Sequence, residues 1–171
     1  VVSTDRTEPE DAPHPAWAAS GMPEYVVRLK SLADHPKQRE FVESPAKRKM
    51  ARAGRRGGKT TGAGILAVRG LLAQRRVLYA TPTSDQLDAF WTEVKTALRE
   101  PIAAGVLYKN ETDHVIEVPG TKVRIRAKTA FNADTLRGDY ADALILDEYQ
   151  LMNESAWEEV RAGWQGRAPA F

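Results

Sequence analysis

The sequence of 171 residues contains no cysteine, so neither a disulfide scaffold nor a zinc site built on thiolates is expected. It contains no apolar run of about 18 residues, and we therefore predict no membrane-spanning helix and no membrane partner. Its three histidines do not have the spacing of metal ligands, which argues against a transition-metal site. Apolar residues make up 42% of the chain and charged residues 28%, which is typical of a globular domain.

Charge of one sign is missing from two long stretches of the chain. Residues 45–76 contain ten basic residues and no acidic one, whereas residues 138–160 contain seven acidic residues and no basic one. A protein with a phosphate-binding half and a metal-binding half would have this distribution. Chance clustering of charges on solvated faces is the alternative.

Apolar periodicity and turn residues predict alternating helices and strands. The predicted helices are residues 24–33, 37–42, 60–73, 84–104 (with Ser84 as N-cap) and 154–164. The predicted strands are residues 49–53, 76–81, 114–118, 121–128 and 143–146, the third and fourth forming a hairpin around Pro119-Gly120. This alternation predicts an α/β fold with a sheet that is parallel at its centre.

The ends of the chain suggest how it is organised. The first 22 residues are rich in proline, alanine and acidic residues, and we predict a disordered or extended leader there. Residues 23–171 are predicted to form one domain. The basic residues of the strand at 121–128 (Lys122, Arg124, Arg126 and Lys128) fall on one face of the strand, for which we predict a solvated outer face; a phosphate-contacting surface is the alternative.

Residues 54–60, G-R-R-G-G-K-T, stand between a predicted strand and an apolar helix. Glycines allow backbone N–H groups to point at an anion, and the N-terminus of the helix adds the positive end of its dipole. This context predicts a phosphate-binding loop, although the usual pattern has a glycine where this chain has Ala53. A glycine-rich turn with an incidental lysine is the alternative. The predicted nucleotide contacts are Gly54, Arg55, Arg56, Gly57, Gly58, Lys59, Thr60 and Thr61, with Thr60 also a ligand of Mg²⁺.

The apolar strand at residues 143–146 leads directly into Asp147 and Glu148. Neighbouring positions of a strand point to opposite sides, but a bend at the end of the strand lets both carboxylates face one cleft. Asp147 can then hold Mg²⁺ through its water shell, and Glu148 can polarise an attacking water. An acidic strand end in solvent is the alternative. Combined with the loop, the pair predicts an ATPase.

These motifs and three further ones resemble the ATPase domain of the large terminase subunit of tailed bacteriophages, the motor that pumps double-stranded DNA into a procapsid. Gln38 lies 21 residues before Lys59, where the family has an adenine-contacting glutamine. Residues 79–83, Y-A-T-P-T, together with Gln86, are similar to the family's segment after its second strand. Residues 136–138, L-R-G, resemble an element whose arginine acts as a finger.

The resemblance implies a fold, a site and partners. The fold would be a three-layer P-loop NTPase sandwich of the RecA-like (ASCE) kind, and the cofactors ATP and Mg²⁺. The catalytic residues would be Glu148, Lys59 and Arg137, with Arg137 acting on a neighbouring subunit of a homo-oligomeric ring. The implied partners are double-stranded DNA, the portal protein and the small terminase subunit, and the implied location is the cytoplasm of an infected or lysogenic bacterial host.

The chain ends 23 residues after Glu148, before the family's coupling motif and without its nuclease domain, so we expect a domain truncated at its C-terminal end. In ATPases of this class a strand is inserted between the loop strand and the carboxylate strand. Residues 49–53 and 143–146 are then expected to run parallel but unpaired, about 9–10 Å apart. A helicase-like DNA-dependent ATPase and a non-hydrolysing prophage remnant remain the alternative functions.

Overall fold

The computed structural model describes residues 25–32, 35–54, 56–130 and 139–152, together with Ser155 and Glu158. The predicted leader at residues 1–22, the L-R-G element at 136–138 and most of the helix predicted at 154–164 lie outside the described residues. The helices are α1 (Pro36–Glu43), α2 (Lys59–Leu72), α3 (Ser84–Ala97) and α4 (Arg99–Ala103), with a 3₁₀ helix at Tyr149–Leu151. The strands are β1 (Val77–Thr81), β2 (Tyr108–Asn110), β3 (Val115–Glu117), β4 (Arg124–Thr129) and β5 (Ala143–Leu146). Within the described ranges, none of the helices has the length and apolar character needed to cross a bilayer.

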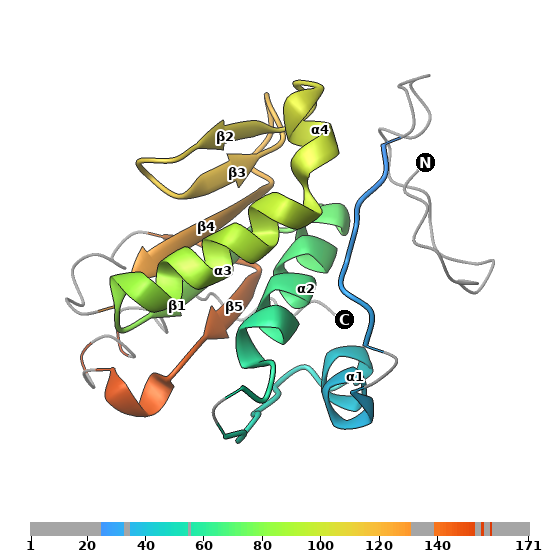
Figure 1. Ribbon diagram of the computed structural model, residues 1–171. Helices are drawn as coiled ribbons and strands as arrows, with labels where there is room; N and C mark the ends of the chain where they lie inside the picture. The colour runs from blue at the N-terminus through green and yellow to red at the C-terminus, as the bar shows by residue number, and fades with distance from the viewer. Residues whose placement is uncertain are drawn as a thin grey trace.

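The five strands form one sheet in the order β2-β3-β4-β1-β5 (Figure 1). Strand β1 is parallel to β4 on one side and to β5 on the other, whereas the pairs β2–β3 and β3–β4 are antiparallel. All five residues of β1 are buried, as expected of a strand between two parallel neighbours. The predicted α/β class, with a sheet that is parallel at its centre and carries a hairpin, is confirmed.

Helices α2 and α3 lie side by side on one face of the sheet (Figure 1). The main core forms between them and β1, where Val77 and Tyr79 meet Val68 of α2 and Phe90 of α3. A smaller apolar cluster lies apart from this core and consists of Ala80 and Ala130, with Leu144, Leu146 and Met152 packed against them. The third layer of the predicted sandwich is not supplied by α2 or α3, since both cover the same face.

Residues 25–32 are extended rather than helical, so the helix predicted at 24–33 is wrong. The segment buries Val27 in the main core and Leu32 against α1 and α2. The Arg28 N–H donates to the Ala97 carbonyl at 3.2 Å. Packing against two helices thus decides the conformation of a segment whose apolar spacing alone suits a helix.

The helix predicted at residues 84–104 is divided into α3 and α4 at Leu98. Pro101 has no N–H, so it cannot donate to the Ala97 carbonyl four residues earlier, and the α-helical ladder is interrupted there. That carbonyl accepts the N–H of Arg28 instead. The N-cap is Thr83 rather than the predicted Ser84, which is the first helical residue.

The strand predicted at residues 49–53 is not formed. Strand structure requires a neighbouring backbone for its N–H and C=O groups, and in the described part of the chain no strand lies beside this segment. Residues 50–54 are exposed, and among the described strands β5 pairs with β1 alone. The segment is indeed unpaired with β5, but the prediction of two parallel strands separated by a gap is wrong because only one of the two is a strand.

The basic face of β4 is not the freely solvated surface predicted from residues 121–128. Arg124, Arg126 and Lys128 converge on Asp139, whose carboxylate lies 2.8 Å from Arg126 Nη1 and 2.5 Å from Lys128 Nζ. The Asp139 side chain is only 6% exposed, and a carboxylate so buried requires such partners. These cations therefore neutralise an internal charge.

Candidate active site

Asp147 and Glu148 follow β5 directly. The Asp147 N–H donates to the Ala80 carbonyl at 2.9 Å, which continues the pairing with β1 beyond the last strand residue. Tyr79 stands opposite Ile145 in this ladder, so strand alternation places Asp147 on the face that α2 and α3 cover. Glu148 has a left-handed backbone, with φ of 49°. This conformation is uncommon outside glycine, and here it bends the chain at the end of the strand.

The bend brings Glu148 to the first residue of α2. Lys59 Nζ forms an ion pair with Glu148 Oε1, and Gln150 Nε2 donates to the other carboxylate oxygen. The Lys59 ammonium, and to a lesser extent Gln150, lower the pKa of Glu148 below its usual value, so the carboxylate is ionised at neutral pH. The Lys59 and Glu148 side chains are 28% and 21% exposed, which leaves both within reach of a polar ligand from solvent.

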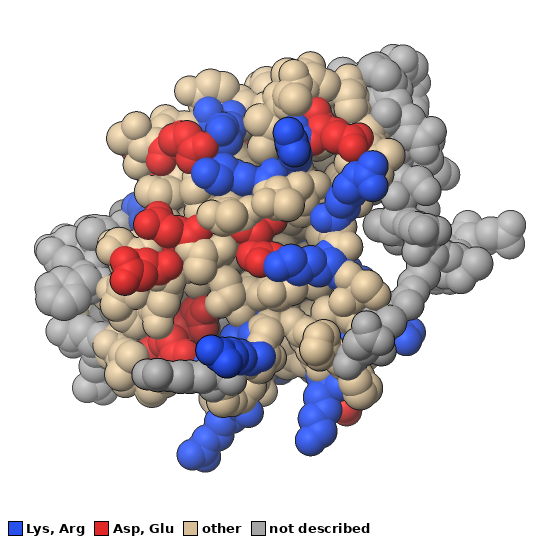
Figure 2. All heavy atoms as spheres, viewed as in Figure 1, with Lys and Arg blue, Asp and Glu red and all other residues tan. Residues whose placement is uncertain are grey.

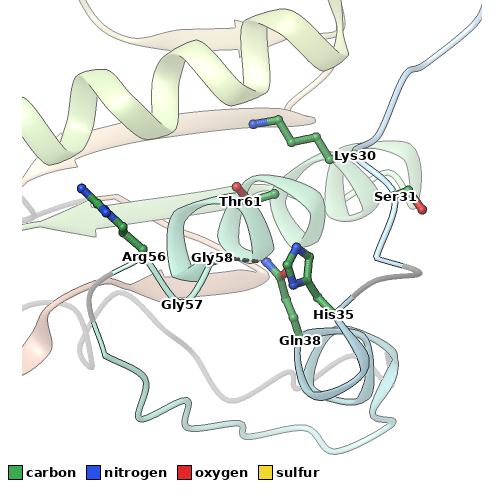
Figure 3. Close-up of a pocket in the computed structure, with 8 residues that line it drawn as sticks. All are labelled: Lys30, Ser31, His35, Gln38, Arg56, Gly57, Gly58 and Thr61. Carbon is green, nitrogen blue, oxygen red and sulfur yellow. Dashed lines mark hydrogen bonds between the residues drawn. The ribbon is translucent and has the colours of Figure 1, made fainter.

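The loop before α2 turns at Gly58, whose φ of +69° lies in the left-handed region. Gln38 of α1 donates from Nε2 to the Gly58 carbonyl at 2.5 Å (Figure 3). The same carbonyl accepts the Gly62 N–H at 2.9 Å in the first turn of α2, and Gly57 N–H donates back to the Gly54 carbonyl at 3.2 Å. Helix α1 therefore holds the loop against the N-terminus of α2.

A pocket of about 330 Å³ lies between this loop and α1 (Figure 3). Its volume is within the range of small-molecule sites, roughly 300–1,000 Å³. It is lined by Lys30, Ser31, His35, Gln38, Arg56, Gly57, Gly58 and Thr61. An anion on the N–H groups at the start of α2 would leave the rest of its molecule beside this pocket.

Exposed basic side chains surround the loop. Lys47, Arg48, Arg52 and Arg56 are all exposed. Figure 2 shows basic side chains projecting from the lower edge of the molecule, the end where α1 and the start of α2 lie in Figure 1. Positive charge beside a helix N-terminus favours the approach of a polyphosphate.

The structure places most of the predicted site residues in two adjoining groups. Five of them line the pocket: Gln38, Arg56, Gly57, Gly58 and Thr61. Three meet at the strand end, namely Lys59, Asp147 and Glu148, and Thr60 is the second residue of α2. Gly54 takes part in the turn of the loop without lining the pocket, and Arg55 and Arg137 lie outside the described residues.

Sequence reasoning missed several residues of the site. Lys30 and Ser31 line the pocket from the extended segment that was predicted to be helical, and no motif marks them. His35 belongs to the H-P-K-Q motif used to place Gln38, and its proximity to that glutamine was the signal available. Tyr79 was used only as part of a family motif, although it contacts Asp147.

The donor set fits magnesium. Thr60 and Asp147 offer a hydroxyl and a carboxylate, which are hard oxygen ligands, and Mg²⁺ in nucleotide sites typically takes only one or two protein ligands besides phosphates and water. Among the described residues no three histidine or acidic side chains cluster into a metal cage. Asp147 Oδ2 accepts the Tyr79 hydroxyl at 3.1 Å, and Oδ1 accepts the Glu148 N–H at 3.0 Å. Burial, followed by the charge of Asp147, raises the pKa of Tyr79, so the phenol stays protonated and donates.

This arrangement defines a class of protein: an α/β P-loop-type domain with its glycine loop at the start of a buried helix and a carboxylate pair at the end of a parallel strand. No family model matches the chain. Two curated proteins do: the large terminase subunits of Thermus virus P23-45, 31% identical, and of Thermus phage G20c, 30% identical, each over 155 residues and 76% of this chain. The chain spans about a third of their length, 32% in each case.

Solved structures agree with the sequence comparison. The ATPase domain of the large terminase of Thermus phage P74-26 is 27% identical, with a TM-score of 0.63 over 74% of this chain and 58% of that domain. The large terminase of bacteriophage HK97 has the same fold, with a TM-score of 0.65 at 14% identity over 84% of this chain and 32% of that protein. These relatives are large terminases, and the resemblance to their ATPase domain predicted from the motifs is confirmed.

The Gly58→Ala substitution is expected to disable the loop. A Cβ at this position would lie 2.7 Å from Gln38 Nε2, and the left-handed φ costs a non-glycine residue about 1–2 kcal/mol. We expect the affinity for an ATP analogue, measured by calorimetry, to fall at least about tenfold. Gly54→Ala is the matched control, because a Cβ there meets nothing within 4 Å and no left-handed φ is involved. Equal affinities in the two variants would contradict the described loop geometry.

Proposed function

We propose that the chain hydrolyses ATP as the motor domain of a phage terminase large subunit and that this hydrolysis drives double-stranded DNA into a procapsid. The observation that carries the proposal is the meeting of Lys59 and Glu148 at the N-terminus of α2, beside the pocket that contains Gln38. The terminase relatives support the choice of motor, since the proteins found by both comparisons are large terminases. They favour it over the helicase-like alternative.

Different described residues bind the phosphates, hold the metal and orient the attacking water. The backbone N–H groups at the start of α2 and the Lys59 ammonium bind the phosphates of ATP. The adenine base of ATP lies in the pocket beside Gln38. Thr60 and Asp147 would hold Mg²⁺, which would neutralise charge on the phosphates. Glu148 orients the attacking water, because a carboxylate ionised at neutral pH accepts a proton from it.

The ion pair between Lys59 and Glu148 makes phosphate binding precede activation of the general base. Lys59 cannot neutralise a phosphate while it neutralises Glu148, and Glu148 cannot orient a water while it binds Lys59. Phosphate binding therefore draws Lys59 away and releases the general base in the same step. In the nucleotide-free chain, the general base Glu148 stays paired with Lys59.

Two predicted arginines complete the proposal. Arg55 of the loop contacts nucleotide, and Arg137 stabilises charge on the phosphates bound by a neighbouring subunit of a homo-oligomeric ring. The portal protein and the small terminase subunit are the remaining proposed partners, and the host cytoplasm is the proposed location.

Phosphate release from ATP and Mg²⁺, with and without double-stranded DNA, tests the proposal on the full chain. We expect turnover that DNA stimulates and that EDTA abolishes. A mixture of Arg137→Ala and Glu148→Gln subunits should recover part of the activity, since some interfaces then contain both intact groups. Nucleotide binding without turnover, in the presence of DNA and with assembly verified, would instead support the non-hydrolysing alternative.

A further inference from the structure

Tyr79 places a polar group in the centre of the main core. Its side chain is fully buried in β1, and its ring stacks on Phe90 of α3 with ring centroids 3.6 Å apart and planes within 1° of parallel. A phenylalanine would fill this space equally well. Packing therefore does not explain the hydroxyl of Tyr79. Burying a hydroxyl is costly unless it has a hydrogen-bond partner.

The hydroxyl donates to Asp147 and also hydrogen-bonds with the side chain of Thr81. Tyr79 and Asp147 are 68 positions apart in the sequence, and the pairing of β1 with β5 brings the phenol to Asp147 Oδ2 at 3.1 Å. The other oxygen, Oδ1, accepts the N–H of Glu148 at 3.0 Å. The backbone N–H of Asp147 is bound to the Ala80 carbonyl. Each carboxylate oxygen thus has one fixed donor and keeps a lone pair for another ligand.

We propose that Tyr79 is a positioning residue for the magnesium-binding carboxylate of Asp147. The phenol is a rigid donor, since its ring is buried and stacks on Phe90 while its hydroxyl donates to Asp147. It holds the carboxylate in one rotamer before the metal arrives, and a ligand ordered in advance binds its metal more tightly. This inference rests on the proposed function, because it assigns Mg²⁺ to Asp147.

The test compares wild-type chain with Tyr79→Phe, which removes one oxygen and keeps the ring that stacks on Phe90. Mn²⁺ is titrated into each protein with a non-hydrolysable ATP analogue present, and free Mn²⁺ is followed by electron paramagnetic resonance. We expect the half-saturating Mn²⁺ concentration to rise about tenfold or more in Tyr79→Phe, as for other partners of metal ligands. The affinity for the analogue in EDTA and the melting temperature should stay close to wild type.

Tyr108→Phe is the matched control. Tyr108 is an exposed tyrosine of β2, at the other edge of the sheet from β5, so its hydroxyl is not expected to affect Mn²⁺ binding. The same change at this position should leave every measured quantity unchanged.

Failure of the inference can be distinguished from failure of the proposed function. A wild-type chain that binds no Mn²⁺ with the analogue contradicts the proposed function and the inference together. Wild-type Mn²⁺ affinity in Tyr79→Phe overturns the inference alone. A Tyr79→Phe chain that fails to fold, or that loses analogue affinity in EDTA as strongly as it loses Mn²⁺, also overturns it, because the hydroxyl then has a general structural role.

Discussion

Lys59→Ala is expected to abolish ATP hydrolysis and to leave the fold intact. Removing one charge that stabilises a phosphoryl transition state typically costs a factor of about 10²–10³ in rate, and the same lysine also binds the ground-state phosphates. The fold should tolerate the change, since alanine suits a helix and a partly exposed ion pair such as that with Glu148 contributes only about 0–1 kcal/mol to stability. Steady-state phosphate release and thermal unfolding measure the two effects.

Lys37→Ala is the control for this substitution. Lys37 is an exposed lysine in the first turn of α1, as Lys59 is in the first turn of α2, and it does not line the pocket. We expect its turnover to equal that of the wild-type chain. A Lys59→Ala protein with wild-type turnover would remove the phosphate-loop assignment.

Glu148→Gln is expected to separate binding from hydrolysis. The amide cannot accept a proton from the attacking water, so turnover should fall by a factor of about 10²–10⁴. ATP affinity should be retained or increased, because the amide no longer competes with phosphate for Lys59. Calorimetry with ATP and single-turnover hydrolysis measure the two quantities.

Glu117→Gln on β3 is a suitable control, since this residue lies two strands away from β1 and outside the pocket. It should alter neither affinity nor turnover. If Glu148→Gln lost ATP affinity as severely as Lys59→Ala, Glu148 would be a binding residue rather than the general base.

The elements that sequence analysis predicted well are those with a strong apolar pattern. Strand β5 is apolar at all four residues and helix α2 buries eight of its fourteen residues, and both were located within a residue or two. The hairpin of β3 and β4 was visible because Pro119-Gly120 separates two alternating stretches. The local apolar pattern is enough to predict such segments.

The errors occur where a distant segment decides the structure. Residues 25–32 are extended because Val27 and Leu32 pack against the helices, and the Arg28 N–H donates to the Ala97 carbonyl that Pro101 cannot bind. Residues 49–53 are not a strand because no described strand lies beside them. Both structures depend on residues outside the segment, so the propensity and periodicity of the segment could not predict them.

The site was predictable in its motifs and not in its contacts. Backbone chemistry at Gly58 and the strand end at Asp147 can be recognised from local sequence. The hydrogen bonds from Gln38 to Gly58 and from Tyr79 to Asp147 join residues 20 and 68 positions apart, and they exist only because α1 packs on α2 and β1 pairs with β5. The catalytic and binding roles of the predicted site residues, including Arg55 and Arg137, stay predictions.

A crystal structure of the chain with Mg²⁺ and a non-hydrolysable ATP analogue tests the central claim most directly. We predict that Lys59 Nζ contacts the β- and γ-phosphates and no longer contacts Glu148. The metal should lie between Thr60 and Asp147, and the adenine in the pocket beside Gln38. An analogue bound elsewhere, or phosphates at the loop with the ion pair of Lys59 and Glu148 still intact, would contradict the account.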